Sequence, residues 1–230
     1  IDFLVFYAKL QDDKYLHASY TPDGAGHSLR VQSDDAGQAL VALGWSDKLE
    51  GGTLVIEGKR ESASEPLTGL FKLENYKISN APALARLLQV ASLTGIFDAL
   101  KRGLDFVSFD GKYSYRDAIL KIEKSRSYGS SIGITLEGEL DLEDDEVDLK
   151  GTVVPAYTVN RVLGQIPILG PILTGGKDEG LFAATYGVTG RLDDPAIAVN
   201  PLSALAPGFL RNLFDVIGGG GEKARGPNSQ

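Results

Sequence analysis

The fold of this chain is decided by residues 131–154, which read SIGITLEGELDLEDDEVDLKGTVV. From residue 132 to residue 142, apolar side chains recur at alternate positions, and the positions between them are polar or glycine. Residues 147–153 repeat the alternation, and Glu143-Asp144-Asp145 separates the two runs. Alternation with a period of two is typical of a strand that has one apolar and one wet face. The stretch therefore predicts an antiparallel hairpin.

The same alternation recurs along most of the chain. Ala118, Leu120 and Ile122 alternate with the charged residues Asp117, Lys121 and Glu123, although Ile119 interrupts the polar side. Further strands are expected at 2–10, 15–20, 28–32, 52–60, 67–79, 104–109, 180–191 and 195–200. Asp23-Gly24 and Asp110-Gly111 predict hairpin turns, because Asp-Gly readily takes the positive φ angles of two-residue turns. The chain is therefore expected to be mostly β and antiparallel.

Several segments have the spacing of amphipathic helices. Ser33-Asp34-Asp35 is a capping sequence for a helix that runs to about Leu43 and ends at Gly44. Asn80-Ala81-Pro82 predicts the start of a second helix, which runs to about Leu100. Residues 207–217 predict a third helix, and residues 158–163 predict a short one. These helices need an apolar surface, so they are expected to cap the sheet.

Composition argues against several kinds of chemistry. The chain has 230 residues, no cysteine, two histidines and a formal net charge of -8. A disulfide, a thiol nucleophile and a Cys-ligated metal are excluded, and a basic surface for nucleic acid is not expected. No GxSxG, P-loop or HExxH sequence occurs. The acidic residues 141–148 lack the spacing of an EF-hand. We expect no enzymatic activity, no cofactor, no metal site and no nucleic-acid partner.

The ends and the longest apolar stretch indicate a piece of a larger protein. The chain has no methionine and starts at Ile1 inside an apolar run, so we expect further sequence upstream. No stretch reaches the roughly 20 apolar residues that span a bilayer. Residues 162–176 are apolar but broken by proline and glycine, which predicts a buried loop or a surface for a membrane or partner. Residues 1–217 are expected to form one domain, followed by a disordered glycine-rich tail at 218–230.

A series of ordered motifs occupies the second half of the chain: APALARLL at 81–88, ASLTG at 91–95, SSIGI at 130–134, GTVVPAY at 151–157, IPILG at 166–170, GLFAA at 180–184, NPLS at 200–203 and APGFLR at 206–211. With these motifs, residues 81–214 resemble the C-terminal domain of AsmA-like proteins, in the YhdP-like form common in alphaproteobacteria. Residues 1–80 share only the strand character of that family.

The resemblance implies a fold, a location and a function. AsmA-like proteins of this kind are anchored in the inner membrane and extend through the periplasm. Their strands form a long, bent sheet with an apolar inner trough, the β-taco or bridge-like fold, and they are implicated in moving phospholipid to the outer membrane. By resemblance, this chain is expected to be a periplasmic, outer-membrane-proximal module that carries phospholipid. The family has no catalytic residues to carry over.

Two sets of apolar residues are candidates for contact with lipid or with a partner. The first is the apolar strand face, which forms either an open groove for acyl chains or a closed core: Leu120, Ile122, Ile132, Ile134, Leu136, Leu140, Leu142, Val147, Leu149 and Val153. The second comprises membrane- or partner-facing elements: Leu163, Ile166, Ile168, Leu169, Ile172, Leu173, Phe209, Leu213 and Phe214. A groove suits acyl chains because each CH₂ kept from water contributes about 0.8 kcal/mol.

A second function is compatible with the same residues. The chain is then a structural or assembly module that docks a periplasmic or outer-membrane protein and carries no lipid. The two functions differ in one property, which is whether the apolar strand face is open or covered.

Overall fold

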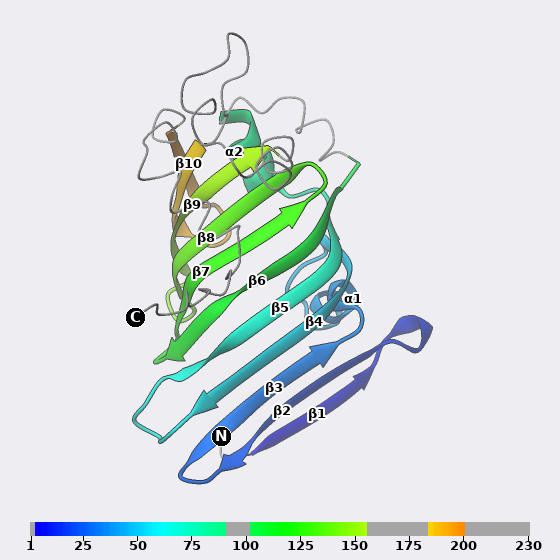
Figure 1. Ribbon diagram of the computed structural model, residues 1–230, viewed down its shortest axis with the longest axis vertical. Helices are drawn as coiled ribbons and strands as arrows, with labels where there is room; N and C mark the ends of the chain where they lie inside the picture. Colours follow the sequence, from blue (N-terminus) through cyan, green and yellow to red (C-terminus); the bar gives the residue numbers. More distant parts are fainter. Residues whose placement is uncertain (1–2, 91–101, 156–183, 201–230) are drawn as a thin grey trace, which may run out of the picture.

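The chain forms one antiparallel sheet in which each strand pairs with the next along the sequence. A computed structural model describes residues 3–90, 102–155 and 184–200. Within these residues the strands are β1 (Leu4–Lys9), β2 (Tyr15–Asp23), β3 (Gly26–Ser33), β4 (Leu49–Arg60), β5 (Leu67–Ile78), β6 (Leu104–Arg116), β7 (Ile119–Gly129), β8 (Ile132–Asp141), β9 (Glu146–Pro155), β10 (Ala184–Arg191) and β11 (Ala196–Asn200). The expected mostly β, antiparallel architecture is confirmed (Figure 1).

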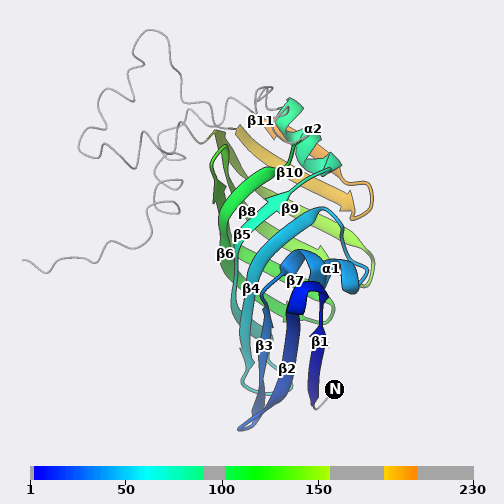
Figure 2. The same cartoon turned by 90° about the vertical axis from the view of Figure 1, so that its right-hand side faces the viewer.

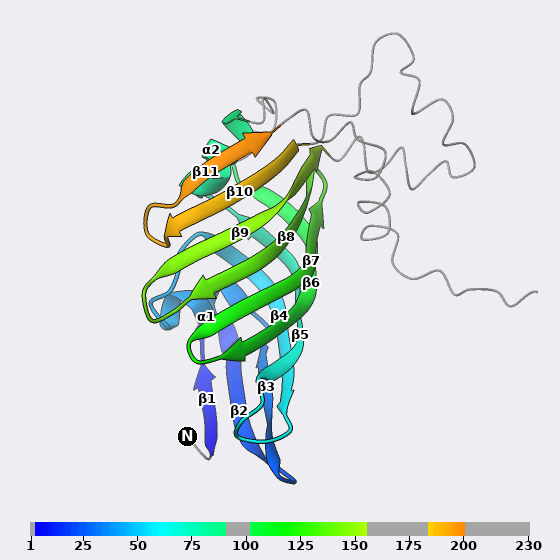
Figure 3. The ribbon, with the colours of Figure 1, turned by 90° about the vertical axis from the view of Figure 1, so that its left-hand side faces the viewer.

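The sheet is bent and does not close, so β1 and β11 are its two edges. At a strand spacing of roughly 4.8 Å, the sheet extends about 48 Å from β1 to β11. Register shifts interrupt the β6–β7 pairing at Phe106/Ser108 and Asp110/Lys112, and the β7–β8 pairing at Ile122/Ser125. Such bulges bend the strand that carries them. Because all three lie in the middle strands, they bend the sheet around its centre (Figures 2 and 3).

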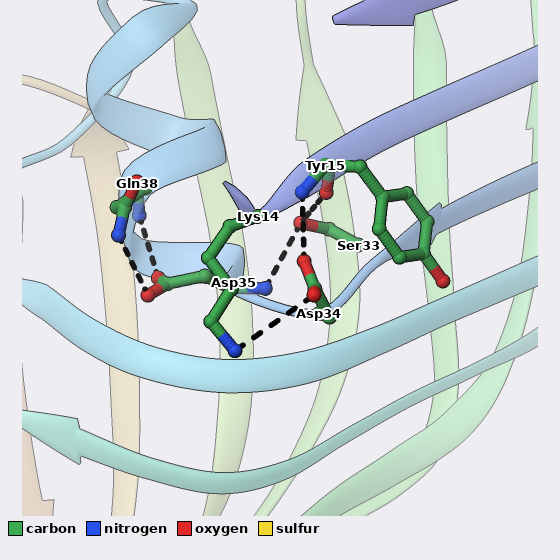
Figure 4. Close-up of polar contacts among 6 residues, drawn as sticks. All are labelled: Lys14, Tyr15, Ser33, Asp34, Asp35 and Gln38. Carbon is green, nitrogen blue, oxygen red and sulfur yellow. Dashed lines mark hydrogen bonds and ion pairs between the residues drawn. The ribbon is translucent and has the colours of Figure 1, made fainter. Parts of the chain in front are cut away.

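The helix α1 (Ala36–Ala42) connects β3 to β4, within the range expected from its capping sequence. The Asp35 carboxylate accepts the backbone N–H of Gln38 at 2.9 Å and its side-chain amide at 3.1 Å (Figure 4). Asp34 accepts the backbone N–H of Tyr15 at 2.8 Å, and the Ser33 hydroxyl donates to the Tyr15 carbonyl at 2.7 Å. Gly44 follows the helix with φ +72°, which favours glycine. These contacts fasten the start of α1 to the start of β2.

The second helix, α2 (Pro82–Val90), connects β5 to β6 and packs on one end of the sheet. Its residues Leu87 and Leu88 are buried among side chains of β5, β6, β8, β9 and β10. The cluster consists of Ala36, Leu73, Tyr76, Leu87, Leu88, Leu104, Phe106, Ile132, Val153, Ala184 and Tyr186. Because both helices contribute to this cluster, the apolar face of the sheet is the face inside the bend (Figure 2).

The turn expected at Asp110-Gly111 is wrong, because β6 runs through both residues without interruption. A Cβ atom at Gly111 would lie 2.6 Å from the Ser125 Cβ and 2.8 Å from the Phe71 ring. The glycine therefore makes room for a neighbouring side chain rather than for a turn. The hairpin turn is at Asp117-Ala118, where φ is 48° and 63°. The turns expected at Asp23-Gly24 and at residues 143–145 are confirmed.

Some expectations fall outside the described residues. They concern the helix beyond Val90, the segments 158–163 and 207–217, and the glycine-rich tail at 218–230. The second set of candidate residues also falls there: Leu163, Ile166, Ile168, Leu169, Ile172, Leu173, Phe209, Leu213 and Phe214.

Candidate functional site

The candidate site is the concave face, by which we mean the side chains that the eleven strands direct into the bend. Paired residues in neighbouring strands lie on the same face of a sheet, so the register aligns them in rows. One row crosses the whole sheet: Phe6, Ala18, Val31, Ile56, Phe71, Gly111, Ser125, Leu136, Gly151, Tyr186 and Val199. A second crosses it nearer the hairpin turns: Leu4, Tyr20, Leu29, Gly58, Gly69, Tyr113, Ile122, Gly138, Leu149, Val188 and Ile197. The apolar face thus continues from edge to edge.

Nine of the ten residues named for the first set share the concave face. The pairings Leu120–Leu140–Val147, Ile122–Gly138–Leu149 and Ile134–Val153 join seven of them across β7, β8 and β9. Ile132 and Leu136 belong to the same face through the alternation of β8. Leu142 differs, because β8 ends at Asp141 and Leu142 lies exposed in the turn that follows. Because Leu142 follows the last residue of β8, it does not line the concave face.

Burial divides the concave face into a covered part and a less covered part. Near the helices, Leu73, Ile132 and Val153 are buried in the cluster beneath α2. Away from the helices, Tyr113, Ser125 and Tyr186 of the two rows are buried. The other large apolar side chains of these rows are only half-buried between β3 and β10: Leu29, Val31, Ile56, Phe71, Ile122, Leu136, Leu149 and Val188. At the β1 edge, Leu4 and Phe6 remain 46% and 42% exposed. Among the described residues, the face is therefore a core at one end, and its aliphatic side chains are partly accessible over its centre.

The opposite, convex face is mostly polar, although Leu70 and Tyr128 are exposed on it. Ion pairs join neighbouring strands at Arg30–Glu57 (3.0 Å), Lys121–Glu139 (3.0 Å) and Lys150–Glu137 (3.3 Å). Their side chains are about half exposed or more, so each pair contributes little to stability. The main consequence of these charged side chains is that the convex face is solvated. The contrast between the two faces gives the sheet a clear apolar side.

Aromatic rings on the concave face lie over glycines of neighbouring strands. The Tyr113 ring lies against Gly69 and its hydroxyl against Gly58, while the Tyr186 hydroxyl lies against Gly151. The Tyr186 hydroxyl donates to the Thr135 carbonyl at 2.8 Å. A side chain at Gly58 would meet the Tyr113 hydroxyl first, and one at Gly69 or Gly151 would meet both the neighbouring backbone and the tyrosine. The rings therefore form part of the floor of the concave face, a feature that alternation in single strands does not reveal.

Burial changes the acidity of three tyrosines on this face. It raises the pKa of Tyr76 to about 12 and the pKa of Tyr113 to about 12. It also raises the pKa of Tyr186. The cause is that an ionised phenolate loses its hydration in an apolar site. All three stay neutral at physiological pH, so they add polarity to the face but no charge.

Two polar groups on the concave face are buried without a hydrogen-bond partner within the described chain. They are the Tyr113 hydroxyl and the Nε atom of Arg60. Arg60 is the last residue of β4 and pairs with His27, which belongs to the same face. Arg60 was not identified from the sequence alone. Its position four residues after Ile56 on one strand indicates that the two residues share a face. Its register assigns a cation to an otherwise apolar face.

The described residues show no constellation typical of catalysis or metal binding. No three His, Asp or Glu side chains in 3–90, 102–155 and 184–200 lie close enough together to hold a metal ion. His27 stacks on Tyr20 at 4.7 Å between ring centroids, and His17 lies beside Tyr7. In the acidic turn, Asp141 accepts the backbone N–H groups of Glu143 and Asp144, which is a structural role. None of the described helices has the length and apolar character needed to cross a bilayer.

Comparison with known proteins adds nothing to the site. No protein-family model, curated protein or solved structure matches this chain. The resemblance to AsmA-like proteins, together with the location, partners and non-enzymatic function that it implies, therefore stays a prediction.

Proposed function

We propose that this chain binds the acyl chains of phospholipid on its concave face and forms one section of a lipid-conducting groove. The observation that carries the proposal is the apolar face that crosses all eleven strands and whose aliphatic side chains, such as Val31, Ile56 and Leu136, are only half-buried at its centre. A soluble domain normally buries such a surface, and an accessible one marks a site of binding. By its resemblance to AsmA-like proteins, the chain would act in the periplasm of a Gram-negative bacterium, near the outer membrane.

The chemistry of the concave face suits an acyl chain that slides along it. Val31, Ile56 and Leu136 offer aliphatic contact without a hydrogen-bonding group that would hold an acyl chain at one position. Each CH₂ transferred from water contributes about 0.8 kcal/mol wherever it lies along such a surface. The free energy is then similar from strand to strand, so an acyl chain can slide without crossing a large barrier. The polar convex face keeps the outside of the sheet in water.

Crosslinking within the full chain tests this proposal. A photoreactive amino acid at Ile134 or Leu149 reports on the concave face, and one at Glu139 or Asp148 reports on the convex face of the same two strands. After irradiation in a Gram-negative host, mass spectrometry should find phospholipid adducts at the concave positions and none at the convex ones. Adducts with protein alone at Ile134 and Leu149 would overturn the proposal.

A second candidate function, docking of an envelope protein, has an observation of its own. The edge strand β1 leaves large apolar side chains exposed on both faces, among them Val5 and Tyr7. In the last turn of α1 and just after it, Val41, Leu43 and Trp45 are exposed as well, and Trp45 is 74% exposed. Exposed edge strands are templates for pairing with another chain. A photoreactive residue at position 45 that captures one defined protein, with no lipid captured at Ile134, would favour this function.

A further inference from the structure

Arg60 is the one charged residue that the described strands place on the concave face by register. It pairs with His27 on β3 and continues the alternation Leu54, Ile56, Gly58 along β4. Lys59, the cation next to it in the sequence, is on the other face of the sheet. Lys59 belongs to the convex face, where it forms ion pairs with Asp23 at 3.5 Å and Glu61 at 3.6 Å. Arg60 has no ion-pair partner among the described residues, so its charge stands at the rim of an apolar surface without compensation.

The Tyr113 hydroxyl lies close to this rim. The Tyr113 ring crosses from β6 over Gly69 of β5, and its hydroxyl reaches Gly58 of β4. Gly58 and Arg60 are two residues apart on one strand and share one face, a separation of roughly 7 Å. The Tyr113 hydroxyl and the Arg60 Nε atom are both buried without an acceptor within the described chain. Buried donors without acceptors are uncommon in folded proteins, so two on one surface indicate an acceptor that the chain itself does not supply.

We propose that Arg60 and Tyr113 hold the phosphate group of a phospholipid whose acyl chains lie along the concave face. This inference rests on the proposed function, since it names the headgroup contact of the same groove. The guanidinium presents a planar set of donors that matches the oxygens of a phosphate in a bidentate arrangement. A phosphate here would supply both missing acceptors and neutralise the arginine. The face beyond, at Ile56 and Phe71, is free of charge and suits the acyl chains.

The position of Arg60 explains why a headgroup would stop there. Arg60 is the last residue of β4. It lies at the end of the strands where the hairpin turns are, and α1 and α2 lie at the opposite end. An anion at this end of the strands stays in contact with water while the acyl chains extend towards the centre of the face. Elsewhere on the concave face, the polar side chains Ser125 and Ser127 are hydrogen-bonded to Leu136 O and to Tyr76. They therefore offer no competing site.

The test compares two lipids with identical acyl chains, phosphatidylglycerol and diacylglycerol, by displacement of a fluorescent acyl probe from the full chain. The wild type should bind phosphatidylglycerol about tenfold or more tightly than diacylglycerol, since a hydrogen bond to a charged group contributes that much. Arg60→Gln should remove the preference and leave diacylglycerol binding unchanged. Tyr113→Phe should reduce the preference by a few-fold. Lys59→Gln, which removes a cation from the convex face, should leave it intact.

Each outcome bears on a different statement. If neither lipid displaces the probe, the proposed function fails. If both bind equally in the wild type, or if Arg60→Gln keeps the preference with a wild-type circular dichroism spectrum, the headgroup contact is wrong and acyl-chain binding stands. Inorganic phosphate in excess is the last arm. Free phosphate that competes as well as phosphatidylglycerol would show a simple anion site and overturn the lipid assignment.

Discussion

The Tyr76 hydroxyl lies 2.6 Å from the Ser127 hydroxyl, although the two residues belong to β5 and β7 and β6 runs between them. The Tyr76 ring lies parallel to the Phe106 ring of β6, with centroids 5.1 Å apart, and so extends over the intervening strand. Both hydroxyls are buried on the concave face. The contact joins three strands at the place where the β6–β7 register shifts, next to Phe106 and Ser108.

Removing either hydroxyl should destabilise the sheet. Tyr76→Phe and Ser127→Ala are each expected to lower the free energy of unfolding by about 1 kcal/mol, because each leaves the other hydroxyl buried without its partner. Urea unfolding of the two single variants and the double variant gives the coupling energy. We expect the double variant to be less destabilised than the sum of the single variants. Strict additivity would show that the hydroxyls do not interact.

Stability should fall at alkaline pH because of the buried tyrosines. The pKa of Tyr76 and that of Tyr113 rise from 10.0 to about 12 on burial. Below pH 10 both are protonated in the folded and unfolded states and have no effect. From pH 10 to pH 12 the unfolded state loses these protons first, so stability falls by up to about 1.4 kcal/mol per pH unit for each group. Chemical unfolding across this range should show the slope, and Tyr113→Phe should reduce it.

Glycines beneath aromatic rings should resist substitution, and a glycine in open space should not. A Cβ at Gly69 would meet the backbone carbonyl oxygen of Glu57 first and would also lie 2.7 Å from the Gly58 Cα and 2.8 Å from the Tyr113 ring, whereas one at Gly187 would approach nothing closer than 3.9 Å. Gly69→Ala is therefore expected to cost about 1–3 kcal/mol of stability, by overpacking. Gly187→Ala should be close to neutral. Thermal unfolding of both variants compares them, and equal effects would contradict the close packing of Glu57 and Tyr113 against Gly69.

The cap of α1 should contribute measurably to stability. Asp35 accepts hydrogen bonds from both the backbone and the side chain of Gln38. Asp35→Ala is expected to cost about 1 kcal/mol, and Asp35→Asn should retain most of the stability, because asparagine is also a good cap. The measurement is the urea midpoint of the two variants. A full loss in Asp35→Asn would show that the negative charge, and not the cap geometry, matters.

A charge on the concave face should expel lipid. Leu136→Asp places a carboxylate in the central apolar row, and we expect lipid co-purification to drop to background because burying that charge against acyl chains is costly. Glu137→Lys changes the next residue on the convex face, where Glu137 pairs with Lys150 at 3.3 Å. It should leave the lipid content unchanged. Circular dichroism identifies unfolding of either variant, and equal lipid loss in two folded variants would contradict the assignment of faces.

Local pattern predicted most of the strands because alternation is a local property. Residues 132–141 and 146–155 form the hairpin that their apolar positions indicated. Asp35 caps the helix that the capping sequence Ser33-Asp34-Asp35 predicted. The pattern was wrong at Asp110-Gly111, where the identity of the dipeptide suggested a turn. Gly111 is required there by the Phe71 ring, which comes from a strand 40 residues away in the sequence. No local signal contains that contact.

By itself, the sequence determined which side of each strand is apolar, since every second side chain points to one face. It also determined the antiparallel order, because short turns join most neighbouring strands. Only the tertiary structure decided what the apolar side becomes. Bulges in β6 and β7 bend the sheet, α2 covers one end, and the register brings Tyr113 and Arg60 to the same rim. Whether a face is covered depends on elements that are distant in sequence, so alternation alone cannot distinguish an open face from a core.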